Sequence, residues 1–422
     1  MKRYSQLEYS FFILAIFYKP VSCRNGTLGV PIISQLLMTF KTTDVKNAVA
    51  LICLFLITSF SNQLSGQQTK VDVTIHSRVD TTNKEVKEVA ALWIHYLNSR
   101  PDSIYDNPYW NTAEKSKFKD FDLSRAYLYQ FPSSQLLESF KPTILSIEKE
   151  GENYYIRTIF SADGLQGAYR TSNPWCITKL YAVKENNEWK LKNALPVITE
   201  KWNKKTVGKI TFIYPPQHVF NEDLAKKANL FCDQITQEFQ FPDWKPFDFY
   251  IADSGDELGR LLNFDFYAAG YTTGTGMRDN RILLSGMGSE FYPHEFIHMI
   301  VPEFDRNRMI EEGFATWKGG AMGKTFDERA TILAKEVDAN DSVTFTDVLN
   351  QQWGWQYAAY YTTGAIFCKA AYDKGGITLV KKLLETPNDN EKLVETMCSL
   401  FGIKKEDMNA FWRREVVAFK GK

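Results

Sequence analysis

The sequence predicts an α+β protein, in which a helix and a curved antiparallel sheet precede a unit with a small sheet and a mainly helical second half. Two observations predict it. Between residues 143 and 195, runs of alternating apolar and polar residues, typical of half-buried strands, are separated by turn-forming sequences. From Phe291 onward, the apolar residues recur at helical spacing instead.

Length and charge narrow the possible classes of protein. The 422 residues correspond to about two to three domains of about 150 residues each. Lys plus Arg and Asp plus Glu each number 50, so the net charge is zero. This balance argues against a nucleic-acid binder, which usually carries a basic surface.

Residues 1–67 are predicted to be a signal peptide with an upstream extension. An apolar run, AVALICLFLITSF (48–60), follows two lysines and precedes small and polar residues, as in secretory signals. The run is shorter than the ~20 residues that span a bilayer as a helix. We expect translation to start at Met38, cleavage between residues 61 and 68, and an exported protein that is periplasmic or secreted and has no stable membrane span once mature. The alternatives are a buried hydrophobic helix and a membrane anchor.

Residues 71–205 are predicted to form an α+β accessory domain. Residues 83–98 carry a helical apolar stripe, and the turn-like sequences EKEGEN and KENNE predict antiparallel hairpins between four strands, at 143–147, 154–160, 177–183 and 189–195. A helix followed by a curved antiparallel sheet resembles the cone-shaped NTF2-like folds. The resemblance implies a domain that binds a ligand or partner.

Residues 206–420 are predicted to form a second domain that opens with a β-α-β unit. The pattern favours a strand at 209–215, a helix at 221–239 capped by Asn221, and a strand at 247–252. A short helix is expected at 256–262, and a further strand at 281–285 precedes the segment with the chemically informative residues.

That segment is His294-Glu295-Phe296-Ile297-His298, an HExxH motif. Positions i and i+4 share one face of a helix, so both imidazoles can bind one metal ion. Glu295 can then act as general base toward a metal-activated water. Pro293 suits the first turn of this helix, and Pro302 must end it soon after His298.

A third metal ligand is expected from the next helical segment, residues 307–320. Its first turns carry Glu311 and Glu312, and spacing alone does not separate the two carboxylates. Gly313 beside them is expected to let this helix approach the HExxH helix closely.

HEFIH followed by EEGFATW resembles the gluzincin zinc peptidases, the thermolysin-like and aminopeptidase-related group also called peptidase MA-like. The resemblance implies that Zn²⁺ is held by His294, His298 and Glu312, with Glu311 as a neighbour. Tyr361 to Phe367 (YTTGAIF) is similar to a Tyr-x-x-Gly-Ala segment of the same families. By that match Tyr361 hydrogen-bonds the oxyanion, with Tyr360 and Tyr357 as alternatives.

GMRDN (276–280) is also similar to the strand that binds the free amino end of the substrate in the aminopeptidases. A polar turn ahead of a strand explains it equally well.

The predicted function is therefore zinc-dependent hydrolysis of a peptide or protein substrate outside the cytoplasm. One alternative is a non-catalytic binding protein, in which the NTF2-like unit binds a ligand or partner and the peptidase domain is a scaffold. Another is a peptidase that acts only on one partner or on cell-wall peptides.

The remaining candidate residues favour structural roles. The four cysteines beyond the signal segment contain no CxxC pair and are expected to be buried small residues, at 176, 232, 368 and 398. His76, His95 and His218 are expected to be structural or surface residues. Trp353 and Trp355 could line a substrate cleft but more often such residues close a core.

Overall fold

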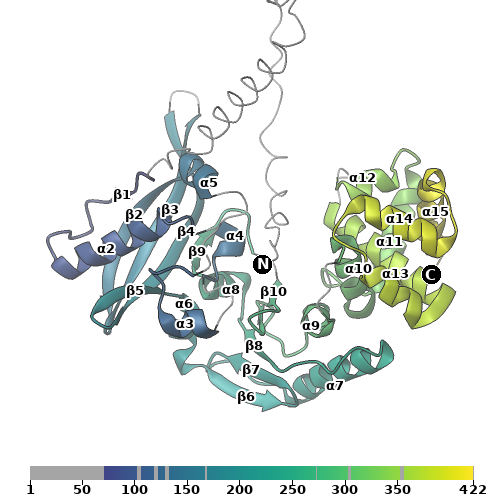
Figure 1. The fold of residues 1–422 in the computed structure, drawn as a ribbon, viewed down its shortest axis with the longest axis horizontal. Coiled ribbons are helices and arrows are strands. Elements are labelled where there is room, and N and C mark those ends of the chain that lie inside the picture. Colours follow the sequence, from purple (N-terminus) through teal and green to yellow (C-terminus); the bar gives the residue numbers. More distant parts are fainter. Residues whose placement is uncertain are drawn as a thin grey trace, which may run out of the picture.

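The computed structural model describes residues 71–421 apart from 102–105, 118–121, 129–132, 167–168, 272, 303–305 and 352–355. The predicted signal segment, Met38 and the Trp353–Trp355 segment lie outside the described residues. The protein is mixed α and β with two open sheets, as the sequence predicts. Figure 1 shows the first sheet on the left, a block of helices on the right, and α9 and β10 between them.

The first sheet is built around three long antiparallel strands. Its order is β1-β2-β3-β4-β5, and all pairs are antiparallel except β1 with β2. The strands are β1 (Thr74–Ile75), β2 (Lys141–Glu150), β3 (Asn153–Gln166), β4 (Tyr169–Glu185) and β5 (Glu188–Lys192). The predicted hairpins are confirmed, except that the last strand ends at Lys192 and a helix begins at Ala194.

Helix α2 (Lys84–Leu97) packs on β2, β3 and β5 and buries the predicted apolar stripe. It begins where the side chain of Asn83 accepts hydrogen bonds from the backbone N–H groups of Glu85 and Val86. Shorter helices complete this part, namely α3 (Thr112–Lys117), α4 (Arg125–Leu128), α5 (Ser133–Ser139), α6 (Ala194–Ile198) and the 3-10 turn η1 (Thr199–Lys201).

The second sheet has the order β10-β11-β8-β7-β6. Its three inner strands are parallel, and the two outer ones are antiparallel to their neighbours. The strands are β6 (Asn203–Val207), β7 (Ile210–Tyr214), β8 (Phe247–Ile251), β10 (Gly274–Met277) and β11 (Ile282–Ser285). Helix α7 (Glu222–Glu238), capped by Asn221, joins β7 to β8, which confirms the predicted β-α-β opening.

The two sheets share a hydrophobic core. Alternate residues of β7 and β8 face opposite sides, because side chains alternate along a strand. Phe212 and Phe249 belong to the core under the helical half, whereas Ile213 and Tyr250 belong to the core of the first sheet. Helix α8 (Gly255–Leu261) and strand β9 (Phe264–Tyr267) follow, and β9 pairs with β4 of the first sheet.

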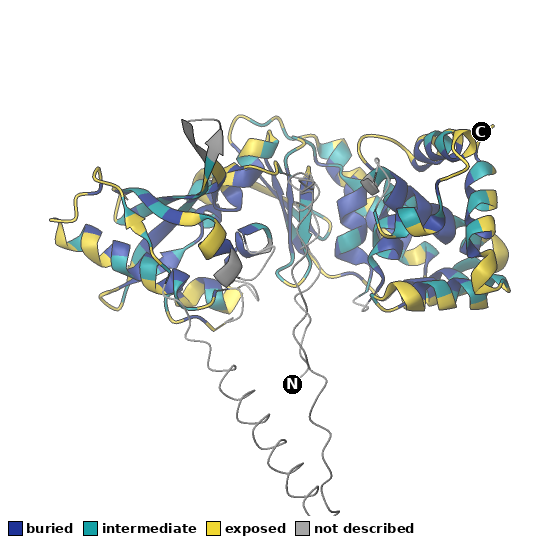
Figure 2. Cartoon of the chain, turned by 90° about the horizontal axis from the view of Figure 1, so that it is seen from above, coloured by how far each residue is buried: buried dark blue, intermediate teal, exposed yellow. Residues whose placement is uncertain are grey.

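The helical half begins at α9 (Pro293–Ile300). It continues through α10 (Arg308–Gly319), α11 (Phe326–Ala339), α12 (Phe345–Leu349), α13 (Gln356–Leu384), α14 (Asn390–Phe401), η2 (Lys405–Asp407) and α15 (Met408–Val417). Helix α13 is interrupted by non-helical backbone at Gly375 and Gly376. Figure 2 shows the buried faces of these helices turned toward one another.

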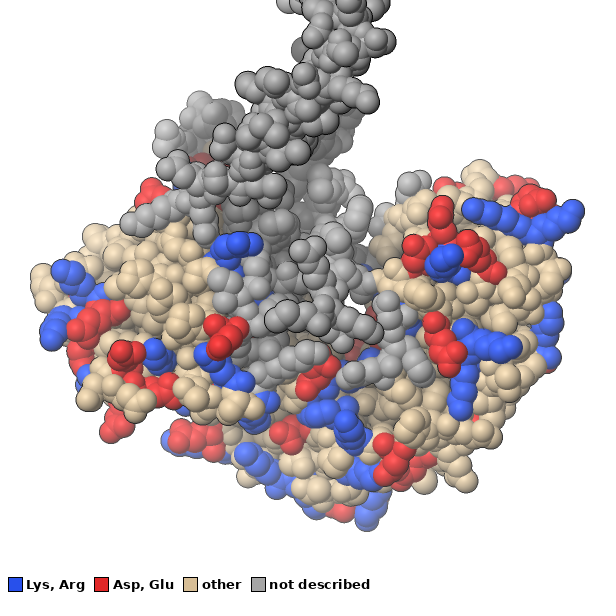
Figure 3. Space-filling view, viewed as in Figure 1, with Lys and Arg blue, Asp and Glu red and all other residues tan. Residues whose placement is uncertain are grey.

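The charge distribution on the surface agrees with the zero net charge of the sequence. Acidic and basic side chains are interspersed over the described face in Figure 3, without a large region of one sign. In the described part of the chain, no helix is both long and apolar enough to cross a bilayer.

Candidate metal centre

The two histidines of HExxH lie on a short helix whose ends are set by the sequence. Pro293 occupies the first turn of α9, where its missing N–H is not needed. The helix ends at Ile300, two residues before Pro302. His294 and His298 are one turn apart on the same face, as expected for positions i and i+4.

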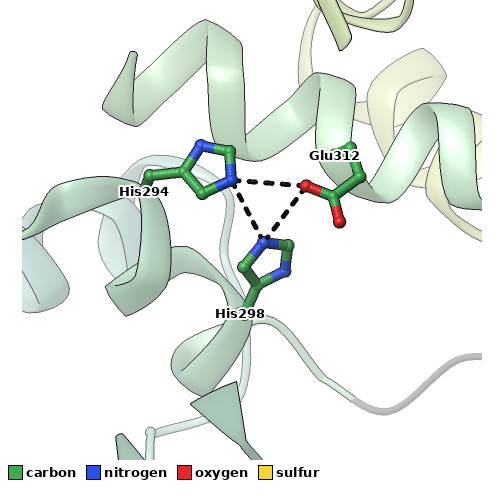
Figure 4. A group of neighbouring side chains, drawn as sticks. All are labelled: His294, His298 and Glu312. Carbon is green, nitrogen blue, oxygen red and sulfur yellow. Dashed lines mark hydrogen bonds and ion pairs between the residues drawn. The ribbon is translucent and has the colours of Figure 1, made fainter. Parts of the chain in front are cut away.

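Three side-chain atoms from α9 and α10 converge on one point (Figure 4). Nε2 of His294 lies 3.3 Å from Oε2 of Glu312 and 3.4 Å from Nε2 of His298. The third edge of the triangle, from Nε2 of His298 to Oε2 of Glu312, is 3.6 Å. The ligand prediction named the same three residues.

The triangle has the dimensions of a tetrahedral metal site. Zinc binds imidazole nitrogen and carboxylate oxygen at about 2.0–2.1 Å, which puts neighbouring ligand atoms of a tetrahedron about 3.3–3.4 Å apart. The three measured edges, 3.3, 3.4 and 3.6 Å, lie close to that value. Two nitrogens and one oxygen are also a donor set that suits a catalytic zinc with one open position.

Contacts on the far side of each ring orient the imidazoles. Nδ1 of His294 donates to the carbonyl of Gly320 at 2.7 Å, so Nε2 is the ring nitrogen that faces the triangle. Nδ1 of His298 lies 3.7 Å from Oε1 of Glu311. Each ring therefore presents Nε2 to the other two groups and has an acceptor at Nδ1.

The structure separates the two carboxylates that spacing could not. Glu312 faces both Nε2 atoms, whereas Glu311 lies on the Nδ1 side of His298. Arg278 Nη2 donates to Glu311 at 3.0 Å, and Arg306 Nε lies 3.6 Å from the same oxygen. Glu311 is thus engaged by cationic groups outside the triangle.

Without a metal, the triangle is held by an ion pair. Burial lowers the pKa of His298, but the charge of Glu312 and the close contacts with Glu311 and Glu312 outweigh it and raise the pKa to about 10. Burial raises the pKa of Glu312, but the charge of His298 and the hydrogen bond with His294 hold this pKa well below its usual range. A metal ion requires neutral imidazoles, so metal uptake must release the proton of His298.

Glu295, the predicted general base, is 8 % exposed beside the triangle. Burial raises its pKa, and the interactions with His298 and His294 only partly oppose this shift. Its carboxylate faces edge strand β10, because a side chain added at Gly276 would lie 3.8 Å from Oε2 of Glu295. The general base therefore lies between the triangle and the end of the second sheet.

Tyr361 on α13 lies against the same site. Its ring is nearly parallel to that of His294, with 6.1 Å between centroids and 13° between planes. Burial and the charge of Glu312 raise the pKa of Tyr361 above its usual value, against a hydrogen bond with Arg308. The hydroxyl accordingly stays protonated at neutral pH and can donate. Tyr360 is buried beside it, and Tyr357 belongs to the first turn of the same helix.

The close approach attributed to Gly313 occurs, but with a different helix. A side chain at Gly313 would lie 2.2 Å from the backbone of Gly364, so Gly313 lets α10 pack on α13. The contact between α10 and α9 is made at Gly319, where a side chain would lie 2.5 Å from the backbone nitrogen of His294. The expectation about Gly313 was therefore wrong in its partner, because residue 319 lies on the α9-facing side of α10.

Two residues near the triangle were not assigned to it from the sequence. Tyr292 precedes α9 and shares a hydrogen bond of 2.6 Å with Thr273, and burial together with Glu295 raises its pKa to about 12. Arg278 follows β10 and contacts Glu311. The similarity of 276–280 to a substrate-binding strand drew attention to this segment without indicating that contact.

The remaining histidines and the described cysteines are not part of the triangle. His76 and His95 are exposed, and His218 hydrogen-bonds the buried Glu290 at 2.8 Å. The cysteines are free thiols, three buried and one half-buried, at 176, 232, 368 and 398. These placements agree with the structural roles expected for them.

Comparison with models of known protein families finds no match to this chain. Comparison with curated protein sequences also finds no match. The functional argument therefore depends on the geometry of the site and on the resemblance of its motifs.

Proposed function

We propose that the protein is an exported zinc-dependent peptidase of the gluzincin type, which hydrolyses peptide bonds in a peptide or protein substrate. The observation that carries the proposal is the triangle formed by His294, His298 and Glu312, with edges of 3.3–3.6 Å. The three residues are the ones that the motif resemblance selects, and a tetrahedral zinc fits the distances between them.

The surrounding residues suit peptide hydrolysis. Zinc held by the triangle would activate a water molecule and polarise the scissile carbonyl. Glu295 would take the proton of that water and deliver it to the leaving amine, a task aided by its raised pKa. Tyr361, kept protonated by burial and by Glu312, would donate a hydrogen bond to the oxyanion.

The position of β10 favours an extended peptide as substrate. This strand is the last of the second sheet and pairs with β11 on one side. An extended chain can add to such an edge through backbone hydrogen bonds. A peptide added there would lie beside Glu295, which faces β10 at Gly276.

The finer fold assignments and the location belong to the same proposal. We take residues 206–420 as the gluzincin catalytic domain, and the first sheet with α2 as an NTF2-like accessory unit. Export to the periplasm or the medium follows from the predicted signal in residues 1–67.

The decisive experiment compares the purified protein with Glu295→Gln. We expect one zinc per chain in both, and hydrolysis of a fluorogenic peptide library by the wild type that a chelator abolishes. The variant should lose at least about 10²-fold in rate, the usual contribution of a general base. His294→Ala should lose zinc as well as activity. Equal hydrolysis by Glu295→Gln would refute the proposed mechanism.

A cavity in the first unit favours a second candidate function, the binding of a small polar ligand without turnover. It has a volume of about 480 Å³ and lies between α3 and the ends of β3, β4 and β5. Its wall includes Glu114, Lys117, Lys184 and Lys192. Zinc-free, inactive protein that still bound a ligand in this cavity would favour the second function over the first.

A further inference from the structure

Arg278 connects the end of strand β10 to the metal site. It follows Met277, the last residue of β10, in the turn that leads to β11. Its Nε donates to the carbonyl of His298 at 2.6 Å, and its Nη2 donates to Oε1 of Glu311 at 3.0 Å. The guanidinium group of Arg278 thus contacts both the backbone of His298 and the carboxylate of Glu311, which lies beside the His298 ring.

The first contact replaces a hydrogen bond that the helix cannot make. In an α-helix, a carbonyl accepts from the N–H of the residue four positions later. For His298 that residue is Pro302, which has no N–H. Arg278 supplies the missing donor, so the last turn of α9 is held at the residue that faces the metal site.

The second contact holds the group on the far side of the imidazole. Oε1 of Glu311 lies 3.0 Å from Arg278 and 3.7 Å from Nδ1 of His298. Arg306 lies 3.6 Å from the same oxygen and is almost fully buried. A histidine that binds metal through Nε2 needs an acceptor at Nδ1, and a fixed acceptor fixes the ring.

We propose that Arg278 is a positioning residue of the metal centre. It acts on His298 directly, through the backbone carbonyl of His298, and indirectly, through Glu311. The inference rests on the proposed function, because it assigns a role toward the metal that the triangle would hold. It also gives Glu311 a definite role, which is to orient His298 rather than to bind the metal.

The test measures metal affinity in the full-length protein by competition with a chromogenic chelator. Arg278→Met and Glu311→Gln should each weaken zinc binding by about 10- to 100-fold, the usual cost of losing such a supporting contact. The double variant should lose less than the product of the two single losses, because both act through one route. Arg278→Lys should recover part of the affinity, since its ammonium can reach either acceptor.

Arg281 offers a matched control on the same turn. Its Nη1 donates to the carbonyl of Met299 on α9 at 3.1 Å, and its Nε donates to that of Pro246 at 3.1 Å. Arg281→Met therefore also removes an arginine that contacts the end of α9. We expect Arg281→Met to keep its zinc affinity within about threefold of the wild type, a much smaller loss than that expected for Arg278→Met.

A spectroscopic measurement separates positioning from general stability. Co²⁺ bound at the site should show a visible absorption spectrum that changes in Arg278→Met and Glu311→Gln and stays unchanged in Arg281→Met. Wild-type zinc affinity and cobalt spectrum in Arg278→Met would overturn the role, as would an equal loss in Arg281→Met. A wild-type protein that bound neither ion would overturn the metal centre itself and this role with it.

Discussion

At the scale of single residues, Tyr361 gives the sharpest test of catalysis. Its ring lies against His294, and burial together with Glu312 raises its pKa, so its hydroxyl remains a donor. Tyr361→Phe should lower kcat by about 10²–10³-fold, the usual cost of one oxyanion donor, with little change in KM. Zinc content should stay the same, because the hydroxyl is not part of the triangle.

Tyr360→Phe is the control for that variant. Tyr360 is adjacent on α13 and buried, at 5 % exposed. Steady-state kinetics of both variants on one peptide decide the matter. If Tyr360→Phe lost the rate while Tyr361→Phe kept it, the oxyanion role would move to Tyr360.

Glu114 gives a residue-scale prediction about stability. Its buried carboxylate accepts hydrogen bonds from Trp110, Asn111 and Asn193, yet burial outweighs them and raises its pKa. The folded state therefore binds the proton more tightly than the unfolded state does. Its contribution to the free energy of unfolding is fully present below the ordinary Glu pKa and is lost as pH rises through the raised value.

The measurement compares the wild type with Glu114→Gln by urea unfolding across that pH range. The variant does not titrate at this position, so the difference in unfolding free energy between the two proteins isolates Glu114. We expect the wild type to lose stability relative to the variant as pH rises. If the wild type instead gained stability relative to the variant as pH rose, the Glu114 carboxyl would have a lowered pKa.

At the scale of elements, the contact between α10 and α13 places two groups of the site. Gly313 follows Glu312 directly, and Gly364 lies one turn after Tyr361. A side chain at either glycine would collide with the other helix. Gly313→Ala should lower the free energy of unfolding by about 1–3 kcal/mol, as overpacking usually does, and should reduce activity by separating Tyr361 from Glu312.

Gly255→Ala is the matched control. Gly255 begins α8, and a side chain there would meet nothing within 4 Å. We expect no loss of stability, because alanine favours a helix over glycine. Urea unfolding of both variants checks the pair. Equal effects would mean that the contact with Gly364 is not responsible.

The sequence predicted the helices whose ends are set by residues within or next to the helix itself. Pro293 and Pro302 bracket α9, and Asn221 caps α7, because these residues act on the helix that carries them. Strand β9 was not predicted, since it has four residues and pairs with a strand from the other predicted unit. Strand β10 (GTGM) was not predicted either, because its two glycines have low strand propensity.

The same distinction applies to the candidate site. The spacing of His294 and His298 follows from helix geometry, so the sequence was sufficient for that pair. Glu311 and Glu312 are neighbours at the start of one helix, and only the packing of α10 against α9 shows which carboxylate faces the imidazoles. Arg278 comes from a distant turn, and no local pattern indicates its contact with Glu311.

At the scale of the whole molecule, the second sheet joins the two predicted units. One face of β7, β8 and β11 packs into the core of the first sheet, and β9 extends that sheet. The residues that the segment after 205 contributes to this core include Ile213, Tyr250, Ala252, Leu258, Leu261, Leu262, Phe264, Tyr267, Ile282 and Leu284. Fully buried large apolar side chains contribute about 1.5–3 kcal/mol each.

The fragment 206–422 should therefore fail to fold, although it contains the whole triangle. Exposing these side chains to water costs a free energy as large as the typical stability of a folded domain, about 5–15 kcal/mol. The full chain should unfold in a single urea transition, and tryptophan fluorescence and circular dichroism should both report the same transition. Residues 71–422, which keep both sheets, are the control and should unfold at the same urea concentration as the full chain. A fragment 206–422 with native zinc affinity, or two separate transitions in the full chain, would show that the units fold independently and that the shared core is dispensable.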